Sequence, residues 1–493
     1  MALRRVALGA AALSAARATQ TVLALVALPV LARLLGPAEF GLVALAMSFV
    51  LFTMAFSDAG MGYSLVRTPK EDTIAWSSAF WTITLLSSGL ALFLIVVAWP
   101  AAWLFAEPRL APLVLALAPI PLVQGMLAAP IADLQQREKF GWLGLAEVTG
   151  AVTGAAVAIW IAFSGGGAWA LVAQQLGVWS GKAVVVVATT EFSPRFVLRR
   201  AGLAPHLRFG RDTAGWSLIN FFARQIDPLV IAKIIGTTAL GFYSMAYRLM
   251  TLPAHLVSGP VQNALFTRMV ALRNDPSGLR ELVLIASRAL ASLIFPAMAV
   301  LAVANAAFIE IFLSQRWLQA APLFAVLAPV GAITAVAGLN GPLLMAVNRT
   351  DLRLRLTFEF TLLWAITVPF LATRGVEMVA IGFAVLFLLY LPRTLQLFLR
   401  PIGGDILGYV RAIATPFAVS CGLAVAHVAT RAVLPMTPWA EIGLAVSEVL
   451  IGYGVIAWLL RGRLTSDLRA VRRLFRAGRP DVVLPPSTMA IQK

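Results

Sequence analysis

A polar stripe runs along an apolar segment of the chain between residues 213 and 235. The stripe consists of Ser217, Asn220, Arg224 and Asp227. Their spacings of three, four and three residues place the four side chains on one face of a helix. The next apolar segment, residues 240–265, carries a second stripe, which consists of Ser244, Arg248, Thr251, His255, Ser258 and Gln262. An unpaired arginine in the middle of such a helix costs about 2.5–3.5 kcal/mol in lipid, so we expect both arginines to face a wet cavity or an anion.

Arginine is suited to phosphate and pyrophosphate because its planar guanidinium group donates two hydrogen bonds at once. We therefore predict a cavity for an anionic, polar substrate. Its candidate residues are Arg17, Gln20, Asn220, Arg224, Arg248, His255 and Gln262. Two alternatives remain open: Arg224 and Asp227 form an ion pair with each other, and Arg17 only anchors its helix at the membrane surface.

Three carboxylates fall inside apolar segments and are candidates for coupling transport to an ion gradient: Asp58, Asp227 and Glu448. Each is also explained as a helix cap or an ion-pair partner. The three histidines, His206, His255 and His427, lie in separate regions without neighbouring acidic pairs. We therefore predict no catalytic residues, no metal site and no cofactor.

The composition requires these stripes to lie in membrane helices. Of the 493 residues 60% are hydrophobic and 12% are charged, and the mean hydropathy is +0.87. Apolar stretches of about 20 residues suit helices rather than the shorter alternating strands of a membrane barrel. We predict an all-α protein with about fourteen transmembrane helices, at residues 14–35, 40–66, 76–104, 110–131, 145–163, 168–188, 213–235, 240–265, 284–312, 320–345, 357–373, 377–399, 409–430 and 439–460.

The distribution of basic residues predicts the orientation. With both termini in the cytoplasm, thirty of the 39 Lys and Arg residues lie on the cytoplasmic side and six in the outer loops. The formal charge of +17 is therefore spread over short loops, which favours contact with anionic inner-leaflet lipids over binding to nucleic acid. The single cysteine, Cys421, excludes an internal disulfide.

One passage of the sequence occurs twice, two hundred residues apart. VLARLLGPAEFGLVALA covers residues 30–46, and VIAKIIGTTALGFYSMA covers residues 230–246. Gly36 and Gly41 in the first copy match Gly236 and Gly241 in the second, and Arg33 matches Lys233. Six spans separate the copies, an even number, so the two halves are predicted to be parallel, pseudosymmetric repeats of six helices around a central cavity.

This repeat predicts five regions. We expect an N-terminal six-helix bundle over residues 1–190, a basic cytoplasmic linker over 191–212, a second bundle over 213–400, two additional transmembrane helices over 401–460 and a basic cytoplasmic tail over 461–493. The tail spaces Leu468, Val471, Leu474 and Phe475 along one helical face, which suits a helix on an anionic membrane surface. A partly disordered tail is the alternative.

Three passages carry a family resemblance: LARLLGPAEFGLVALAMSF, FSDAGMGYSLVR and ARQIDPLVIAKIIGTTALGFYSMAYRL. They resemble the Wzx-type oligosaccharide flippases of the multidrug/oligosaccharidyl-lipid/polysaccharide (MOP) exporter superfamily. The resemblance implies a bacterial inner-membrane protein that moves oligosaccharide repeat units, linked to undecaprenyl pyrophosphate, to the periplasmic leaflet for exopolysaccharide or lipopolysaccharide biosynthesis. It implies a cationic central cavity, which Arg224 and Arg248 would supply, and contact with polysaccharide polymerase or export machinery.

Two other functions fit the sequence less well. A cation-coupled multidrug exporter of the same superfamily is expected to line its cavity with carboxylates and aromatic rings, whereas the deepest charges here include two arginines. A membrane glycosyltransferase or acyltransferase needs convergent acidic residues or histidines at a membrane face, and this pattern is missing from the sequence. We therefore predict a transporter and not an enzyme.

Overall fold

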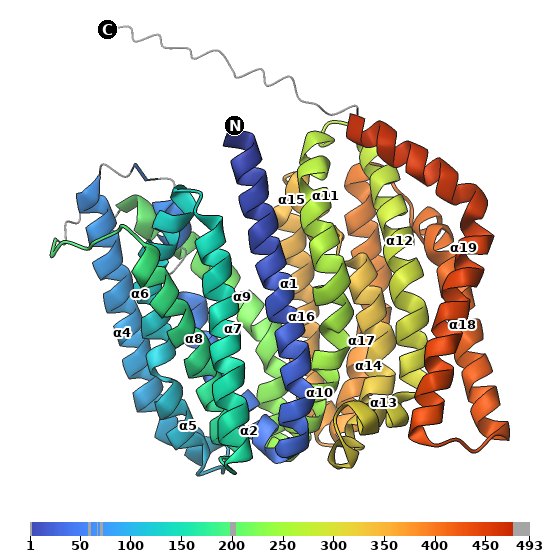
Figure 1. Ribbon diagram of the computed structural model, residues 1–493, viewed down its shortest axis with the longest axis horizontal. Coiled ribbons are helices and arrows are strands. Elements are labelled where there is room, and N and C mark those ends of the chain that lie inside the picture. Colours follow the sequence, from blue (N-terminus) through green and yellow to red (C-terminus); the bar gives the residue numbers. More distant parts are fainter. Residues whose placement is uncertain (1, 58–60, 67, 70–71, 198–203, 477–493) are drawn as a thin grey trace, which may run out of the picture.

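The computed structural model is an all-helical bundle (Figure 1). It describes residues 2–57, 61–66, 68–69, 72–197 and 204–476. Each of the fourteen predicted spans coincides with one helix or with two consecutive helices, and the described residues contain no strand. Among these described residues, eleven segments are long and apolar enough to cross a membrane. The other three predicted spans are α1, α9 and α10 with α11, which carry the polar residues singled out above.

The first half of the chain forms eight helices within the described ranges. They are α1 (Ala2–Leu34), α2 (Pro37–Phe56), α3 (Met61–Leu65), α4 (Thr73–Leu104), α5 (Leu110–Leu117), α6 (Pro119–Gln136), α7 (Phe140–Phe163) and α8 (Ala168–Thr189). Glycines on both helices allow α7 and α8 to pack with their backbones in contact. A Cβ atom on Gly154 would lie 2.8 Å from the carbonyl oxygen of Gln174, and one on Gly181 would lie 3.1 Å from the Cα of Gly150. Close packing of small residues is a main source of helix association in lipid.

The second half begins with α9. Its helices are α9 (Ala204–Ile234), α10 (Thr237–Pro253), α11 (Gly259–Ala271), α12 (Pro276–Val303), α13 (Asn305–Phe312), α14 (Ala320–Ala337), α15 (Asn340–Ala346), α16 (Thr350–Ala372) and α17 (Val376–Leu399). A π-helical turn, Ala254–Ser258, separates α10 from α11. It lies between Pro253 and Pro260, and proline removes a backbone donor and bends the helix.

The last two helices, α18 (Ile406–Val433) and α19 (Pro438–Arg476), lie at one edge of the bundle beside α12 (Figure 1). The first part of the predicted tail continues α19, at the same end of the bundle as the N-terminus. Two ion pairs hold it to α12: Arg288 with Asp467 at 2.5 Å and Arg473 with Glu281 at 2.9 Å. Residues 477–493 of the tail lie outside the described residues.

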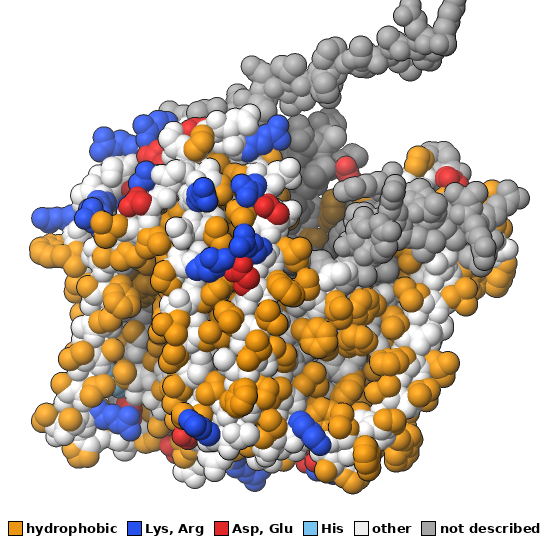
Figure 2. All heavy atoms as spheres, turned by 180° about the vertical axis from the view of Figure 1, so that it is seen from behind, with side chains coloured by type: hydrophobic (Ala, Val, Ile, Leu, Met, Phe, Trp, Pro, Cys, Tyr) orange, Lys and Arg blue, Asp and Glu red, His pale blue; other side chains and the backbone are white. Residues whose placement is uncertain are grey.

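The surface has the pattern of a membrane protein. On the face seen in Figure 2 a broad apolar band separates two charged rims, and most Lys and Arg side chains gather at one rim. The exposed surface includes many large apolar side chains, for example Trp103 at 85% and Phe370 at 74%. Such a band is expected where lipid covers the protein.

The two copies of the repeated passage meet where α2 crosses α10. A Cβ atom on Gly41 would lie 1.7 Å from the carbonyl oxygen of Thr237, and one on Gly241 would lie 1.9 Å from that of Pro37. The backbones of the two helices are therefore in contact, and only glycine fits at either position. This crossing joins the first half of the chain to the second, near the end of the bundle opposite the N-terminus (Figure 1).

Candidate substrate cavity

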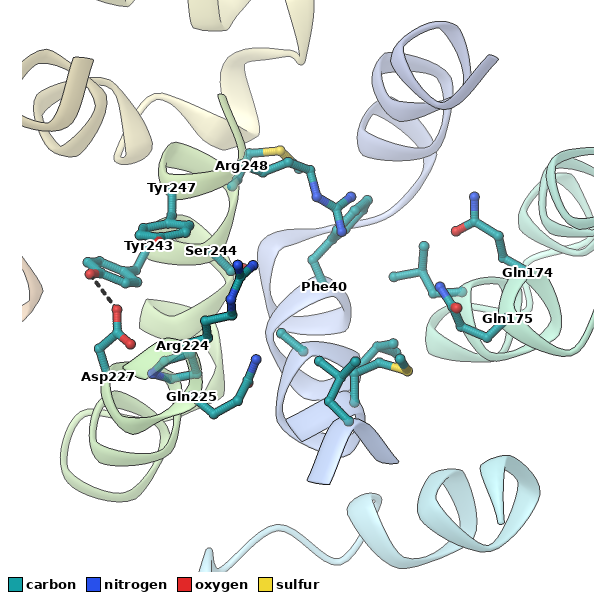
Figure 3. Close-up of a pocket in the computed structure, with 17 residues that line it drawn as sticks. Phe40, Gln174, Gln175, Arg224, Gln225, Asp227, Tyr243, Ser244, Tyr247 and Arg248 are labelled. Carbon is teal, nitrogen blue, oxygen red and sulfur yellow. Dashed lines mark hydrogen bonds between the residues drawn. The ribbon is translucent and has the colours of Figure 1, made fainter. Parts of the chain in front are cut away.

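A cavity of about 340 Å³ lies between α2, α8, α9 and α10, next to this crossing (Figure 3). Its volume falls within the range of about 300–1,000 Å³ that is common for small-molecule sites. The lining residues are Phe40, Val43, Ala44, Met47 and Leu51 of α2, Leu171, Gln174 and Gln175 of α8, Arg224, Gln225, Asp227 and Pro228 of α9, and Tyr243, Ser244, Met245, Tyr247 and Arg248 of α10.

Arg224 is exposed to the cavity, and its Nε donates a hydrogen bond to Oδ1 of Asn220 at 3.4 Å. Asp227 has a different partner: it is 5% exposed, and Oδ2 accepts a hydrogen bond from the Tyr243 hydroxyl at 2.7 Å. Arg224 and Asp227 form no ion pair with each other, although they lie one turn apart on the same helix. The guanidinium group of Arg224 therefore stays available to a ligand.

Arg248 projects from α10 into the space between α10 and α2 (Figure 3). Its side chain is exposed, and it makes no hydrogen bond or ion pair within the described part of the chain. An uncompensated charge at this depth requires water or an anion, because transfer to an apolar environment costs several kcal/mol.

The opposite wall of the cavity is uncharged. Gln174 and Gln175 on α8 present amide groups to the cavity, which can donate to and accept from hydroxyl groups (Figure 3). Gln225 on α9 already accepts a hydrogen bond from the Ser48 hydroxyl at 2.9 Å. Our sequence analysis did not include these glutamines; the available signal was two adjacent amides inside an apolar span.

A third arginine lies close to the cavity. Arg353, in the first turn of α16, is half-buried and interacts electrostatically with Arg224. The sequence assigned it to a basic loop between spans, because the approach of α16 to α9 is a tertiary contact.

The other candidate residues do not line this cavity. Gln20 is half-buried on α1, and Gln262 on α11 lies against Gly338, which follows the end of α14. His255 is exposed in the π-helical turn. Arg17 lies on α1, but its side chain is outside the described residues, as is the whole of Asp58.

Glu448 lies on α19, in a separate group of residues. Its Oε2 is 2.7 Å from Nδ1 of His427, which is fully buried on α18. Because these helices are at the edge of the bundle, Glu448 does not contact the cavity.

Further contacts join the two halves at the end of the bundle opposite the N-terminus. Arg33, at the end of α1, donates to the carbonyl oxygen of Ile311, and Lys233, at the end of α9, donates to that of Leu104. Each repeated basic residue thus binds a helix end of the other half, where backbone carbonyls lack partners. Trp317, fully buried, adds a hydrogen bond of 2.8 Å to the carbonyl oxygen of Ala32.

Comparison with known proteins agrees with this architecture. Residues 30–322 match the model of a family described as polysaccharide biosynthesis protein. The chain belongs to this family. The matched region includes all four helices that form the cavity.

Two curated relatives of the polysaccharide biosynthesis family illustrate its range. The chain is 30% identical to the succinoglycan biosynthesis transport protein ExoT of Rhizobium meliloti, over 62% of this chain and 61% of ExoT. It is 26% identical to the lipopolysaccharide biosynthesis protein WzxC of Escherichia coli, over 74% of each chain. The match therefore spans less than two thirds of ExoT and about three quarters of WzxC.

Two solved structures show that this family member has the fold of MOP transporters. The lipid II flippase MurJ, in an inward closed conformation, superposes with a TM-score of 0.76 over 92% of this chain and 99% of MurJ, at 13% identity. An inward-facing multidrug resistance transporter of the MATE family gives a TM-score of 0.56 over 83% of this chain and 95% of that protein, at 15% identity.

Proposed function

We propose that this protein is a flippase that moves undecaprenyl-pyrophosphate-linked oligosaccharide repeat units across the bacterial inner membrane by alternating access. The observation that carries the proposal is the pair of arginines, Arg224 and Arg248, exposed in one cavity without an ion-pair partner among the described residues. The relatives' names support it, since they include a transport protein for succinoglycan and a lipopolysaccharide biosynthesis protein.

The two walls of the cavity suit the two parts of such a headgroup. The arginines would bind the pyrophosphate through charge-assisted hydrogen bonds, and Gln174 and Gln175 would face the hydroxyl groups of the first sugar. A cavity of about 340 Å³ holds only part of the glycan, so the remaining sugars would extend into the open side. The polyprenyl tail would stay in the bilayer while the headgroup crosses.

Transport needs such a cavity because the headgroup's charges and hydroxyls would lose their hydrogen bonds to water in the bilayer and would form no others there. Donors on the protein replace that water. We place both termini in the cytoplasm, following the basic residues, so the contacts of Arg33 and Lys233 between the halves would lie on the periplasmic side. Asp58, Asp227 and Glu448 remain candidates for ion coupling, and anionic inner-leaflet lipids and polymerase or export machinery remain candidate partners.

The proposal is tested in a deletion strain complemented with variants. The measured quantities are surface polysaccharide and the leaflet in which lipid-linked repeat units accumulate. We expect Arg224→Ala and Arg248→Ala to trap complete repeat units on the cytoplasmic side. The matched control is Arg374→Ala, because this arginine is exposed in the turn between α16 and α17, away from the cavity.

Other outcomes would contradict the proposal. Normal polysaccharide from both cavity variants would exclude the cationic site. Incomplete repeat units in the deletion strain would indicate an enzyme, and unchanged polysaccharide with new sensitivity to cationic drugs would indicate the multidrug exporter.

A further inference from the structure

The α18–α19 pair contains a buried group of titratable residues away from the cavity. His427 on α18 has no exposed surface and lies between two carboxylates of α19. Its Nδ1 is 2.7 Å from Oε2 of Glu448, and its Nε2 is 3.6 Å from Oε1 of Glu441. Arg431, one turn along α18 and half-exposed, has its Nη1 3.4 Å from the same oxygen of Glu441. We call these four residues the hairpin cluster.

With a neutral imidazole, the hairpin cluster has too few hydrogen atoms to give every buried polar atom a hydrogen bond. An ionised carboxylate only accepts, so Nδ1 of His427 must carry the hydrogen that is shared with Glu448. A neutral imidazole has a single N–H, so Nε2 is then an acceptor. It faces Oε1 of Glu441, which is also an acceptor. Both atoms are buried, and neither has a hydrogen-bond partner among the described residues.

The charges of the hairpin cluster also indicate that one hydrogen is missing between Nε2 and Oε1. With Glu441 and Glu448 ionised, Arg431 positive and the imidazole neutral, one net negative charge remains at a site where both carboxylates are less than one tenth exposed. A buried net charge is costly. One additional proton neutralises the cluster, and between Nε2 and Oε1 it supplies the missing hydrogen.

The helices around the hairpin cluster add no further charge to it. Val300 at the end of α12 and Ala304, just before α13, pack against Ala445 of α19. Two acidic residues lie on neighbouring helices and have other surroundings: Glu310 of α13 accepts a hydrogen bond from Gln315 at 3.0 Å, and Glu377 of α17 lines a separate opening beside Thr238.

The charged residues of α12 lie far from the cluster along that helix. Arg280, Glu281 and Arg288 pair with Asp405, Arg473 and Asp467. Within the described part of the chain, the charged groups that face His427 are therefore those of α18 and α19.

We propose that the hairpin cluster is a binding site for one proton. The proton enters beside Arg431, near the turn between α18 and α19, which lies at the end of the bundle opposite the N-terminus. When it is bound, Nδ1–H donates to Glu448, and Nε2–H draws Oε1 of Glu441 from 3.6 Å to hydrogen-bond distance, so α18 holds both carboxylates of α19. When it leaves, the hydrogen between Nε2 and Oε1 is lost and the net negative charge returns.

This site is independent of the substrate that the cavity carries. It gives Glu448 a specific ligand, the proton, and it adds His427 and Glu441, which our sequence analysis did not consider together. With the termini in the cytoplasm, the proton would come from the periplasm.

The test uses the small number of histidines. The full chain contains three, so the protein labelled with ¹⁵N-histidine in lipid bilayers gives three imidazole spectra by solid-state NMR. His206→Gln and His255→Gln assign two of them without changing the buried site. We expect His427 to carry hydrogens on both nitrogens when the proton is bound and on Nδ1 alone when it is released. An imidazole that shows only one of these two forms at every pH at which the protein stays folded would overturn the proposal.

Three variants separate the proton site from a general effect on the fold. The side-chain amide in Glu441→Gln can donate to Nε2 without a bound proton, so we expect His427 to remain neutral throughout. Arg431→Gln removes a positive charge from a half-exposed position, so His427 should stay protonated to higher pH. Glu310→Gln, a carboxylate on neighbouring α13, is the matched control and should leave the His427 titration unchanged. Equal titration in wild type, Glu441→Gln and Arg431→Gln would contradict the proposal.

Discussion

The two halves of the chain contribute different charges to the cavity. In the second half, α9 and α10 carry Arg224 and Arg248, which line it. At an offset of two hundred residues, the corresponding first-half positions are Ala24 and Ser48. The glycines at the helix crossing, Gly41 and Gly241, are alike in both copies. The packing contact is thus present in both halves, whereas the binding charge is present in one.

This difference indicates that the two copies have separate tasks. A crossing of backbones needs glycine on both helices, because either Cβ atom would collide with a carbonyl of the other helix. In the proposed function, two arginines on one side of the cavity would bind the pyrophosphate, and the uncharged glutamines of α8 would face the sugar hydroxyls.

The largest effect is expected at the shared crossing. Gly241→Ala places a methyl group 1.9 Å from the carbonyl oxygen of Pro37, so the helices must separate. Overpacking of this kind costs about 1–3 kcal/mol or more. We expect a clear fall in the melting temperature of the purified protein and loss of polysaccharide export. In the control Gly36→Ala, from the turn between α1 and α2, the added methyl group has open space, and stability should be unchanged.

The next effect concerns the charged wall. Arg248→Ala should reduce transport roughly 10- to 100-fold, because a hydrogen bond to a charged group contributes about 1.5–3 kcal/mol. Ser48→Ala, at the corresponding position, removes the hydrogen bond to Gln225 and should cost about 1 kcal/mol, or roughly fivefold. The rate of repeat-unit translocation measures both. Equal losses of transport in the two variants would show that positions 48 and 248 are equivalent.

A swap sharpens this prediction. The double variant Ser48→Arg with Arg248→Ser preserves the number of arginines and moves one from α10 to the corresponding position on α2. We expect it to remain inactive, because Ser48 is 1% exposed and an arginine does not fit there. Restored export would mean that only the total charge matters.

A smaller effect is expected at Arg33 and Lys233, the basic residues that join the two halves. Arg33→Gln and Lys233→Gln each weaken one contact between the halves, to the carbonyl oxygens of Ile311 and Leu104. Because the two contacts correspond, each variant should raise the population in which the two halves are separated at this end by a similar, few-fold factor. Accessibility of a cysteine placed at Thr237 to a membrane-impermeant reagent measures the opening. A large effect from one variant alone would show that one half dominates closure.

The smallest effect concerns the start of the connection between the halves. The Glu191 carboxyl accepts a hydrogen bond from Lys139 at 2.6 Å, and this bond, together with the charge of Arg137, lowers its pKa. A lowered pKa in the folded state adds stability above the carboxyl's ordinary pKa, and this stability is lost as the pH falls through the folded value. Glu191→Gln should therefore reduce the melting temperature slightly at pH 7, and by less as the pH falls below the ordinary pKa of a glutamate. An equal reduction at both pH values would exclude the ionic explanation.

The sequence predicted the cavity arginines because spacing reveals a helical face. Arg224 and Arg248 both line the cavity, on α9 and α10. The sequence did not show whether Arg224 and Asp227 pair with each other, because the actual partner of Asp227, Tyr243, comes from another helix. Gln174, Gln175 and Arg353 were missed for the same reason: single polar residues in a span or a loop give no sign of what they face. Gln20, His255 and Gln262 remain predictions for a larger cavity.

What the sequence determined by itself is the set of membrane helices, their order and the repeated turn, because these depend on local apolar length, on helical spacing and on glycine. What only the tertiary structure decided is which polar groups meet. The buried contact of His427 with Glu441 and Glu448 and the contact of Gly41 with α10 join residues that are far apart along the chain or on different helices. The physical reason is that a helix fixes the direction of a side chain, while its partners are set by how the helices pack.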